Sequence, residues 1–128
     1  MAIRIVRLGT ERLPSEGIRI GTVRRPPRGV PKTDYASRNY YDVWLPLLAP
    51  SSELVKQALA SKTDPDWSRF VKKYRKEMAD THERTLLDTL AALSHQTNFS
   101  IGCYCADESR CHRSVLRQLL AERGANIQ

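Results

Sequence analysis

The chain has 128 residues and a formal net charge of +7, from 21 basic and 14 acidic residues. This length favours one domain spanning residues 1–128, and a hydrophobic content of 41% is too high for a disordered chain. No apolar run is long enough to span a membrane, and the arginines among the first seven residues do not fit a signal peptide. The basic surplus favours anionic partners such as phosphates, nucleotides or nucleic acid.

The first part of the chain predicts strands and loops. Apolar residues recur at strand-like spacing in residues 3–6 and 18–23, and the segment 10–17 between them has the composition of a loop. Residues 24–32 contain three prolines, one glycine and four cationic side chains, so we expect a rigid basic loop. Residues 40–46 are rich in aromatic side chains, which predicts either a short strand or an irregular packed segment.

The remainder predicts helices and one further strand. Apolar residues at spacings of three and four predict helices over 52–60, from 64 onward and over 81–94, with Asp64 as the N-cap of the second. Residues 99–103 then alternate like a strand, and a last helix follows with Gly124 at its C-cap position. Strands near both ends with helices between them predict an α/β fold: a small two-layer or three-layer domain with a mainly parallel sheet and flanking helices.

The segment 101–113 contains most of the chemically versatile side chains. All three cysteines fall within it, and Cys111, His112 and Arg113 follow one another at the expected start of the last helix. A strand, a polar loop and a helix N-terminus direct free backbone N–H groups and a positive dipole end at the loop. Three cysteines within nine positions do not resemble a disulfide framework, so we expect reduced thiols and a cytoplasmic protein.

The basic loop (residues 24–32) and the loop that begins after Tyr104 and contains Cys105, which we call the cysteine loop, both follow predicted strands. If these strands are parallel, both loops open on the edge where open parallel sheets bind ligands. We therefore expect an anion-binding crevice in which planar guanidinium groups hold a phosphate or carboxylate. Its predicted residues are Arg24, Arg25, Arg28 and Arg113. The alternative is that these arginines are solvated or paired with Asp107 and Glu108, which could otherwise give the site polar support.

Thiol chemistry is a second prediction for the same segment. A cysteine at a helix N-terminus near a histidine and several arginines has a lowered pKa, so Cys111 is the first candidate and Cys105 the second. His112 is the third catalytic candidate, although its helical register also fits simple packing against apolar neighbours. The spacing of Cys and Arg in protein phosphatases is not met, so we do not expect that mechanism. Cys103 fits a buried apolar position at the end of a strand.

A metal site is a third possibility, which we do not favour from the sequence. Cys103, Cys105, Cys111 and His112 match the residue types of a Cys₃His zinc site, and the first two share one face of a strand. Their spacing is unlike the usual paired knuckles, and adjacent residues on a helix point about 100° apart. No cofactor is therefore expected, with zinc or iron as the alternative.

Several motifs together resemble the domain-of-unknown-function family 488, DUF488. In residues 105–116, a cysteine and acidic residues precede Cys-His-Arg at the start of the last helix, as in that family's signature. Residues 23–28 are similar to its second signature, an arginine- and proline-rich turn after a strand. Residues 43–51 and the spacing of Trp67, Phe70, Tyr74 and Glu77 resemble its YeaO-like branch. The resemblance implies a small cytoplasmic α/β domain and brings no particular activity.

The chain departs from the commonest form of that family at both ends. We find no helix between the first two predicted strands, and only residues 126–128 remain for a closing strand. The sequence thus predicts binding, with optional processing, of a phosphate-bearing small molecule or nucleic acid, and it leaves open whether the protein is an enzyme. The alternatives are a non-enzymatic basic nucleic-acid-binding module and a Cys/His metal-binding or redox-sensing protein.

Overall fold

The computed structural model describes residues 1–128 and contains one four-stranded sheet, in which every pair of neighbouring strands is parallel. The strand order is β1-β4-β2-β3. The strands are β1 (Ile3–Arg7), β2 (Ile18–Gly21), β3 (Val43–Trp44) and β4 (Phe99–Cys103). The mainly parallel α/β fold is therefore confirmed, no helix separates β1 from β2, and the aromatic-rich segment forms a strand of only two residues.

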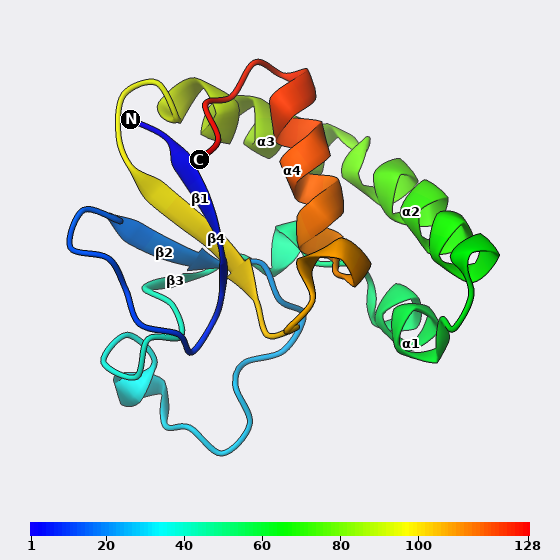
Figure 1. The fold of residues 1–128 in the computed structure, drawn as a ribbon, viewed down its shortest axis with the longest axis horizontal. Helices are drawn as coiled ribbons and strands as arrows, with labels where there is room; N and C mark the ends of the chain where they lie inside the picture. Colours follow the sequence, from blue (N-terminus) through cyan, green and yellow to red (C-terminus); the bar gives the residue numbers. More distant parts are fainter.

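Four α-helices lie on one side of the sheet (Figure 1). They are α1 (Ser52–Ala60), α2 (Asp64–Met78), α3 (Thr81–Leu93) and α4 (His112–Glu122). Three short 3₁₀ helices lie in the connections: η1 (Lys32–Asp34), η2 (Pro46–Leu48) and η3 (Glu108–Arg110). None of the helices combines the length and the apolar character needed to cross a membrane.

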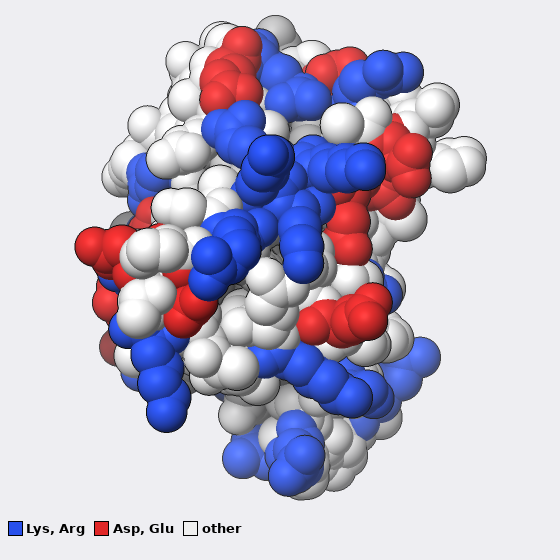
Figure 2. Space-filling view, turned by 90° about the vertical axis from the view of Figure 1, so that its right-hand side faces the viewer, with Lys and Arg blue, Asp and Glu red and all other residues white.

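The helices bury one face of the sheet in the main core. Ile3 and Ile101 on the strands and Leu116 on α4 are fully buried there. Helix α2 contributes Phe70 and Tyr74 to this core from one side of its surface. Its outer side is cationic, and Lys and Arg gather on the face of the molecule where α2 lies (Figure 2). The spacing of apolar residues in the sequence correctly predicted which side of α2 is buried and which is exposed.

Loops, rather than helices, cover the other face of the sheet. Arg19 on β2 points to this face and is completely buried, where its guanidinium donates hydrogen bonds to both carboxylate oxygens of Glu16 at 2.8 and 3.0 Å. Ser100 on β4 donates a further hydrogen bond to Glu16 at 2.8 Å. On the same face, Gly21 leaves room for Tyr41, whose ring carbon would lie 2.3 Å from an added Cβ. The two segments 8–17 and 35–42 thereby replace a second helical layer.

Two helix boundaries test the capping predictions. Helix α2 is capped by Thr63, whose hydroxyl accepts a hydrogen bond from the Asp66 N–H at 3.2 Å, so the prediction of Asp64 as N-cap was wrong by one residue. Asp64 is instead the first helical residue, where its charge favours the helix dipole. Gly124 has a φ of +77° just after α4, as expected for a C-cap glycine. The chain end then adds a single bridge, Ile3 to Ile127, beside β1.

The connections diverge at the carboxyl end of β4. This strand continues into α4 on the helical face, whereas β1 and β2 on either side of it continue into loops that cover the opposite face. Open parallel sheets bind ligands where neighbouring strands send their connections in opposite directions. The end of β4, where the cysteines lie, is such a position.

Candidate functional site

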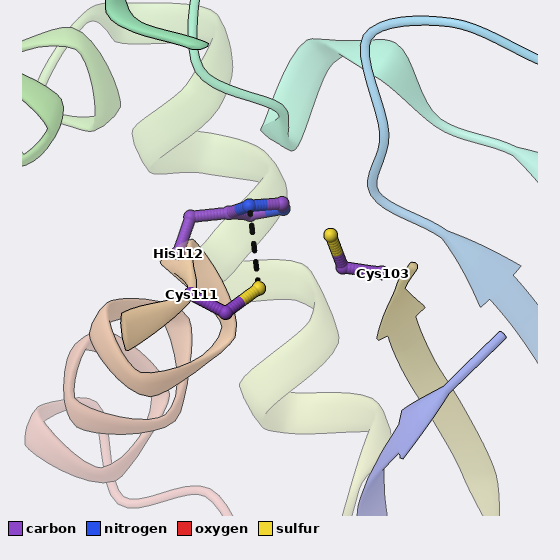
Figure 3. A group of neighbouring side chains, drawn as sticks. All are labelled: Cys103, Cys111 and His112. Carbon is purple, nitrogen blue, oxygen red and sulfur yellow. Dashed lines mark hydrogen bonds between the residues drawn. The ribbon is translucent and has the colours of Figure 1, made fainter. Parts of the chain in front are cut away.

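Three thiols and one imidazole converge at the end of β4. Cys103 is the last residue of β4, Cys111 directly precedes α4, and Cys105 lies in the loop between them. The sulfur atoms of Cys103 and Cys105 are 3.8 Å apart, and the sulfur of Cys111 is 3.8 Å from Nδ1 of His112. Ligand atoms of Cys103, Cys111 and His112 all lie within 4.8 Å of one another (Figure 3). These three residues could hold a metal ion.

The proximity of Cys111 to His112 follows from the local backbone. Cys111 is the N-cap of α4 and has φ −123° and ψ 151°, which is extended rather than helical. The expectation that the side chains of Cys111 and His112 point about 100° apart, as adjacent residues on a helix do, was therefore wrong. An N-cap residue directs its side chain independently of the helix that follows, so adjacent residues can approach the same point.

His112 is both packed and oriented. Its Nε2 lies 2.6 Å from the Thr22 carbonyl oxygen, and its ring packs edge-on against Tyr74 at 5.7 Å between centroids. Because a carbonyl oxygen only accepts hydrogen bonds, Nε2 carries a proton, and in the neutral imidazole Nδ1 then presents its lone pair towards Cys111. The Thr22 hydroxyl donates to the Gly102 carbonyl at 3.0 Å, which fixes Thr22 against β4. The two alternatives weighed from the sequence, packing and chemistry, are thus compatible.

The thiols differ in exposure and in charge. Cys103 and Cys111 are buried, whereas Cys105 is exposed. Hydrogen bonds from the Cys103 and Cys111 thiols lower the pKa of Cys105 to about 3 against the opposing effect of burial, and the Arg113 charge adds to the lowering. Donating that hydrogen bond raises the pKa of Cys103. Although Cys111 ranks first from the sequence, Cys105 is the thiol that a ligand can reach.

Arg113 supports the cysteine loop from inside the protein. The residue is 3% exposed, and its Nη2 donates a hydrogen bond to the Cys105 carbonyl oxygen at 2.6 Å. Its buried Nε has no hydrogen-bond partner. The guanidinium therefore holds the loop in place and supplies positive charge beside Cys105, while one of its N–H groups stays unused.

The basic loop reaches the same edge, but its arginines point in different directions. Arg24 donates hydrogen bonds to the carbonyl oxygens of Pro46, Ala49 and Pro50 at 3.0–3.1 Å, which commits its guanidinium to the segment around η2. Arg25 and Arg28 are exposed. The structure thus places Arg25 and Arg28, but not the guanidinium of Arg24, on the open surface of this loop.

The acidic candidates of the cysteine loop serve its own conformation. Asp107 accepts hydrogen bonds from the backbone N–H and hydroxyl of Ser109 at 3.0 and 2.7 Å, which caps η3 and lowers the pKa of its carboxyl. Glu108 forms a two-point ion pair with Arg117 on α4, at 2.7 and 3.1 Å. Neither carboxylate forms an ion pair with a predicted anion-binding arginine.

Three residues of this site were not singled out from the sequence. The Tyr104 hydroxyl donates to the Arg25 carbonyl oxygen at 2.9 Å and so joins the two loops, while Arg7 donates to the Tyr104 carbonyl at 3.1 Å. Thr22 holds His112, as described above. Arg7 pairs with Cys103 in the register of β1 and β4, so the parallel arrangement alone could have placed it at this edge.

A surface groove between helices lies elsewhere. It lies between α1 and α2, has a volume of about 520 Å³ and is lined mainly by charged and polar side chains, among them Glu53, Lys73 and Glu77. None of the thiols and neither His112 nor Arg113 lines it. The chemically distinctive site is therefore a surface edge with one exposed cysteine, outside this groove.

Comparison with known proteins gives one match. A protein-family model described as "Active DUF488-N3 subclade" matches residues 3–124. No curated protein and no solved structure is significantly similar to the chain. The match spans β1 to the C-cap of α4 and therefore includes both the basic loop and the cysteine loop.

Proposed function

The chain belongs to the DUF488 family, and we propose that it binds a phosphate-bearing ligand at the carboxyl edge of its sheet, with Cys105 as the reactive group. The ligand would be a nucleotide or the phosphorylated end of a nucleic acid. One observation carries this proposal: the exposed residue Cys105, whose carbonyl oxygen accepts a hydrogen bond from Arg113, lies at an edge where two loops meet. The matched family model is described as active, which agrees with a site that performs chemistry.

The anion would bind to exposed guanidinium groups at the carboxyl edge of the sheet, which we call the rim of the site. Arg25 and Arg28 on the basic loop are exposed, and Arg7 lies at the end of the neighbouring strand. Planar guanidinium groups hold phosphate through pairs of hydrogen bonds. The buried Arg113 would add positive charge to the site, because its charge already helps to lower the pKa of the Cys105 thiol. Arg24 would serve this site indirectly, by fixing the start of the basic loop against η2.

The thiol would act as a nucleophile towards the bound ligand. Cysteine reacts as the thiolate, and thiolates form in electropositive, partly exposed surroundings such as that of Cys105. The buried pair Cys111 and His112 lies directly behind it and can exchange a proton within the cluster. We place this chemistry in the cytoplasm, where thiols stay reduced.

Binding is tested by titrating a nucleoside monophosphate and inorganic phosphate into the protein by calorimetry. A variant with both Arg25→Ala and Arg28→Ala should bind the nucleotide about 10-fold more weakly, because two exposed charged contacts of about 0.7 kcal/mol each sum to about 1.4 kcal/mol, which is tenfold in affinity. Arg84→Ala is the matched control, since it removes an equally exposed arginine from α3. Equal affinities in the double variant and the control would refute the anion site.

The thiol is tested by following alkylation with iodoacetamide by mass spectrometry of peptides. Cys105 should be modified first and should react faster than a free cysteine model peptide at pH 6, where unperturbed thiols are protonated. Bound nucleotide should slow this reaction in the wild type. Uniform slow labelling of all three cysteines would exclude Cys105 as the reactive group.

A non-enzymatic nucleic-acid-binding module is the second candidate. The observation that favours it is the cationic outer surface of α2, where Arg69, Lys72, Lys73 and Lys76 are exposed and basic side chains gather (Figure 2). Such binding would be steeply salt-dependent, because each neutralised phosphate releases counterions. Charge-reversal variants Lys72→Glu and Lys76→Glu should then abolish binding of single-stranded DNA and leave nucleotide binding unchanged.

A further inference from the structure

We propose that Cys103, Cys105, Cys111 and His112 bind one Zn²⁺ ion as a tetrahedral site. This zinc site goes beyond the proposed binding of a phosphate-bearing ligand at the carboxyl edge of the sheet. It also deepens the proposed use of Cys105, because a zinc-bound thiol is deprotonated outright, and to that extent it rests on the proposed function. The distances between the thiols and His112 do not depend on whether any phosphate binds.

The distances between the donor atoms are those of a zinc site. With Zn–S bonds of about 2.3 Å and Zn–N bonds of about 2.0–2.1 Å, the donors of a tetrahedral site lie about 3.5–3.8 Å apart. The pairs Cys103–Cys105 and Cys111–His112 are each separated by 3.8 Å. The ligand atoms of Cys103, Cys111 and His112 are within 4.8 Å of one another, and the Cys105 sulfur adjoins this group through Cys103.

The surroundings of His112 are those of a metal ligand. Histidines that bind metals usually donate the other ring N–H to a carbonyl or carboxylate, which fixes the tautomer. Here Nε2 donates to the Thr22 carbonyl at 2.6 Å, so the Nδ1 of the neutral ring faces the thiols with its lone pair, 3.8 Å from the Cys111 sulfur. Figure 3 shows the imidazole and the sulfur atoms of Cys103 and Cys111 pointing towards a common region.

The charge around the cluster fits the same ion. Three thiolates, one neutral imidazole and Zn²⁺ carry one net negative charge. The Arg113 guanidinium, bonded to the Cys105 carbonyl, lies beside the cluster, and the N-terminus of α4 begins at His112. Both would stabilise that charge in a site where two of the sulfur atoms are buried.

Zinc fits this donor set better than iron. Three thiolates with one imidazole is a common set for structural zinc, whereas iron–sulfur clusters generally use four thiolates. In the proposed site, Cys103, Cys111 and His112 are buried ligands and Cys105 is the ligand at the surface. A thiolate bound to zinc at the surface is kept ionised at neutral pH and stays within reach of an electrophile.

The experiment uses the full chain purified with and without added zinc. Metal content by elemental analysis should approach one zinc per chain. The metal-free protein should bind Co²⁺ with the visible absorption of a tetrahedral ion and a near-ultraviolet band from thiolate-to-cobalt charge transfer. Titrated Zn²⁺ should displace the cobalt and remove both bands. Iron in place of zinc, an octahedral cobalt spectrum or no binding would overturn the proposal.

Variants then identify the ligands. Cys105→Ser changes an exposed side chain, so it should fold, lose charge-transfer intensity and bind Zn²⁺ at least about 100-fold more weakly, because even the loss of outer partners costs about 10- to 100-fold. His82→Asn is the control, since His82 is exposed on α3. An unchanged zinc affinity in Cys105→Ser would remove this residue from the site.

The zinc proposal and the phosphate proposal can fail separately. Nucleotide titration of the chelated, metal-free protein tests the rim arginines without the ion. Zinc should raise the thermal unfolding temperature of the wild type with the logarithm of its free concentration above Kd, since an ion that binds only the folded chain stabilises it. A protein that binds nucleotide but shows no zinc-dependent stabilisation would retain the first proposal and lose the second.

Discussion

Replacing Glu16 by glutamine tests the buried ion pair that holds the loop-covered face of the sheet. Glu16 is 5% exposed and Arg19 is completely buried. The Glu16 carboxylate accepts two hydrogen bonds from Arg19, one from Ser100 and a longer one from the half-buried Arg4 at 3.3 Å. Arg19 also donates to the carbonyl oxygens of Thr10 and Asn39, both at 2.8 Å, so its charge remains fixed when the carboxylate is removed.

The expected loss in the free energy of unfolding is about 3 kcal/mol. Removing one partner of a buried ion pair costs about 3–5 kcal/mol, because the other charge stays buried without compensation. Glutamine keeps one acceptor oxygen for Arg19, so the lower end of that range applies. With a urea dependence of about 1.5–2 kcal/mol per M for a small domain, the midpoint should fall by about 1.5–2 M.

Urea denaturation followed by the two tryptophans measures this loss, and a double variant controls it. Glu16→Leu combined with Arg19→Met removes both charges and should be much less destabilised than Glu16→Gln. Burial would raise the pKa of Glu16, but hydrogen bonds from Arg19 and Ser100 outweigh it and hold the pKa below the usual value. The wild-type contribution is therefore present at neutral pH and lost as pH falls through that lowered pKa. A loss below 1 kcal/mol, or one independent of pH, would show that the charge of Glu16 does not compensate that of Arg19.

Three further predictions concern single contacts. Gly102→Ala should destabilise the fold by about 1–3 kcal/mol in urea denaturation, because the new Cβ would lie 2.6 Å from a Leu8 methyl carbon. Thr63→Ala removes the N-cap of α2 and should cost about 1 kcal/mol, with an unchanged midpoint contradicting the cap. Tyr104→Phe frees the Arg25 carbonyl and should weaken nucleotide binding several-fold while stability falls by no more than about 1 kcal/mol. Unchanged nucleotide affinity would show that this bond does not position the basic loop.

The helices and strands could be predicted because the spacing of apolar residues within each one shows which of its faces is buried. Helix α1 begins and ends where the sequence indicates, and α3 ends one residue earlier than expected. The N-cap of α2 was misplaced because Thr63 and Asp64 are adjacent and both have capping side chains, so only the hydrogen bond decides. Arg19 could not be recognised as buried, because its carboxylate partner and covering loops come from other parts of the chain.

The secondary structure around the cysteines was predicted in outline, but the contacts of the side chains there were not. The strand, the loop and the helix start of residues 101–113 follow from the local sequence pattern. The parallel arrangement of the strands also predicted the shared edge of the sheet, where Tyr104 and Arg25 meet. The commitment of Arg24 to carbonyl oxygens depends on where the segment around η2 folds back, which no local pattern encodes. The narrower assignment to a YeaO-like branch stays a prediction, since the matched model identifies a DUF488 subclade by another name.

The position of β4 explains why the chemistry concentrates at one point. Because β4 lies between β1 and β2, its carboxyl end has a strand end on each side, which supplies Arg7 from one and Thr22 from the other. Its own continuation turns into α4 on the opposite face from theirs, so Cys111 and His112 return over the strand that ends in Cys103. A shift of β4 to the edge of the sheet would leave the thiols together but separate His112 from the Thr22 carbonyl that orients it. The strand order, more than any single motif, therefore determines that sulfur, imidazole and guanidinium groups meet here.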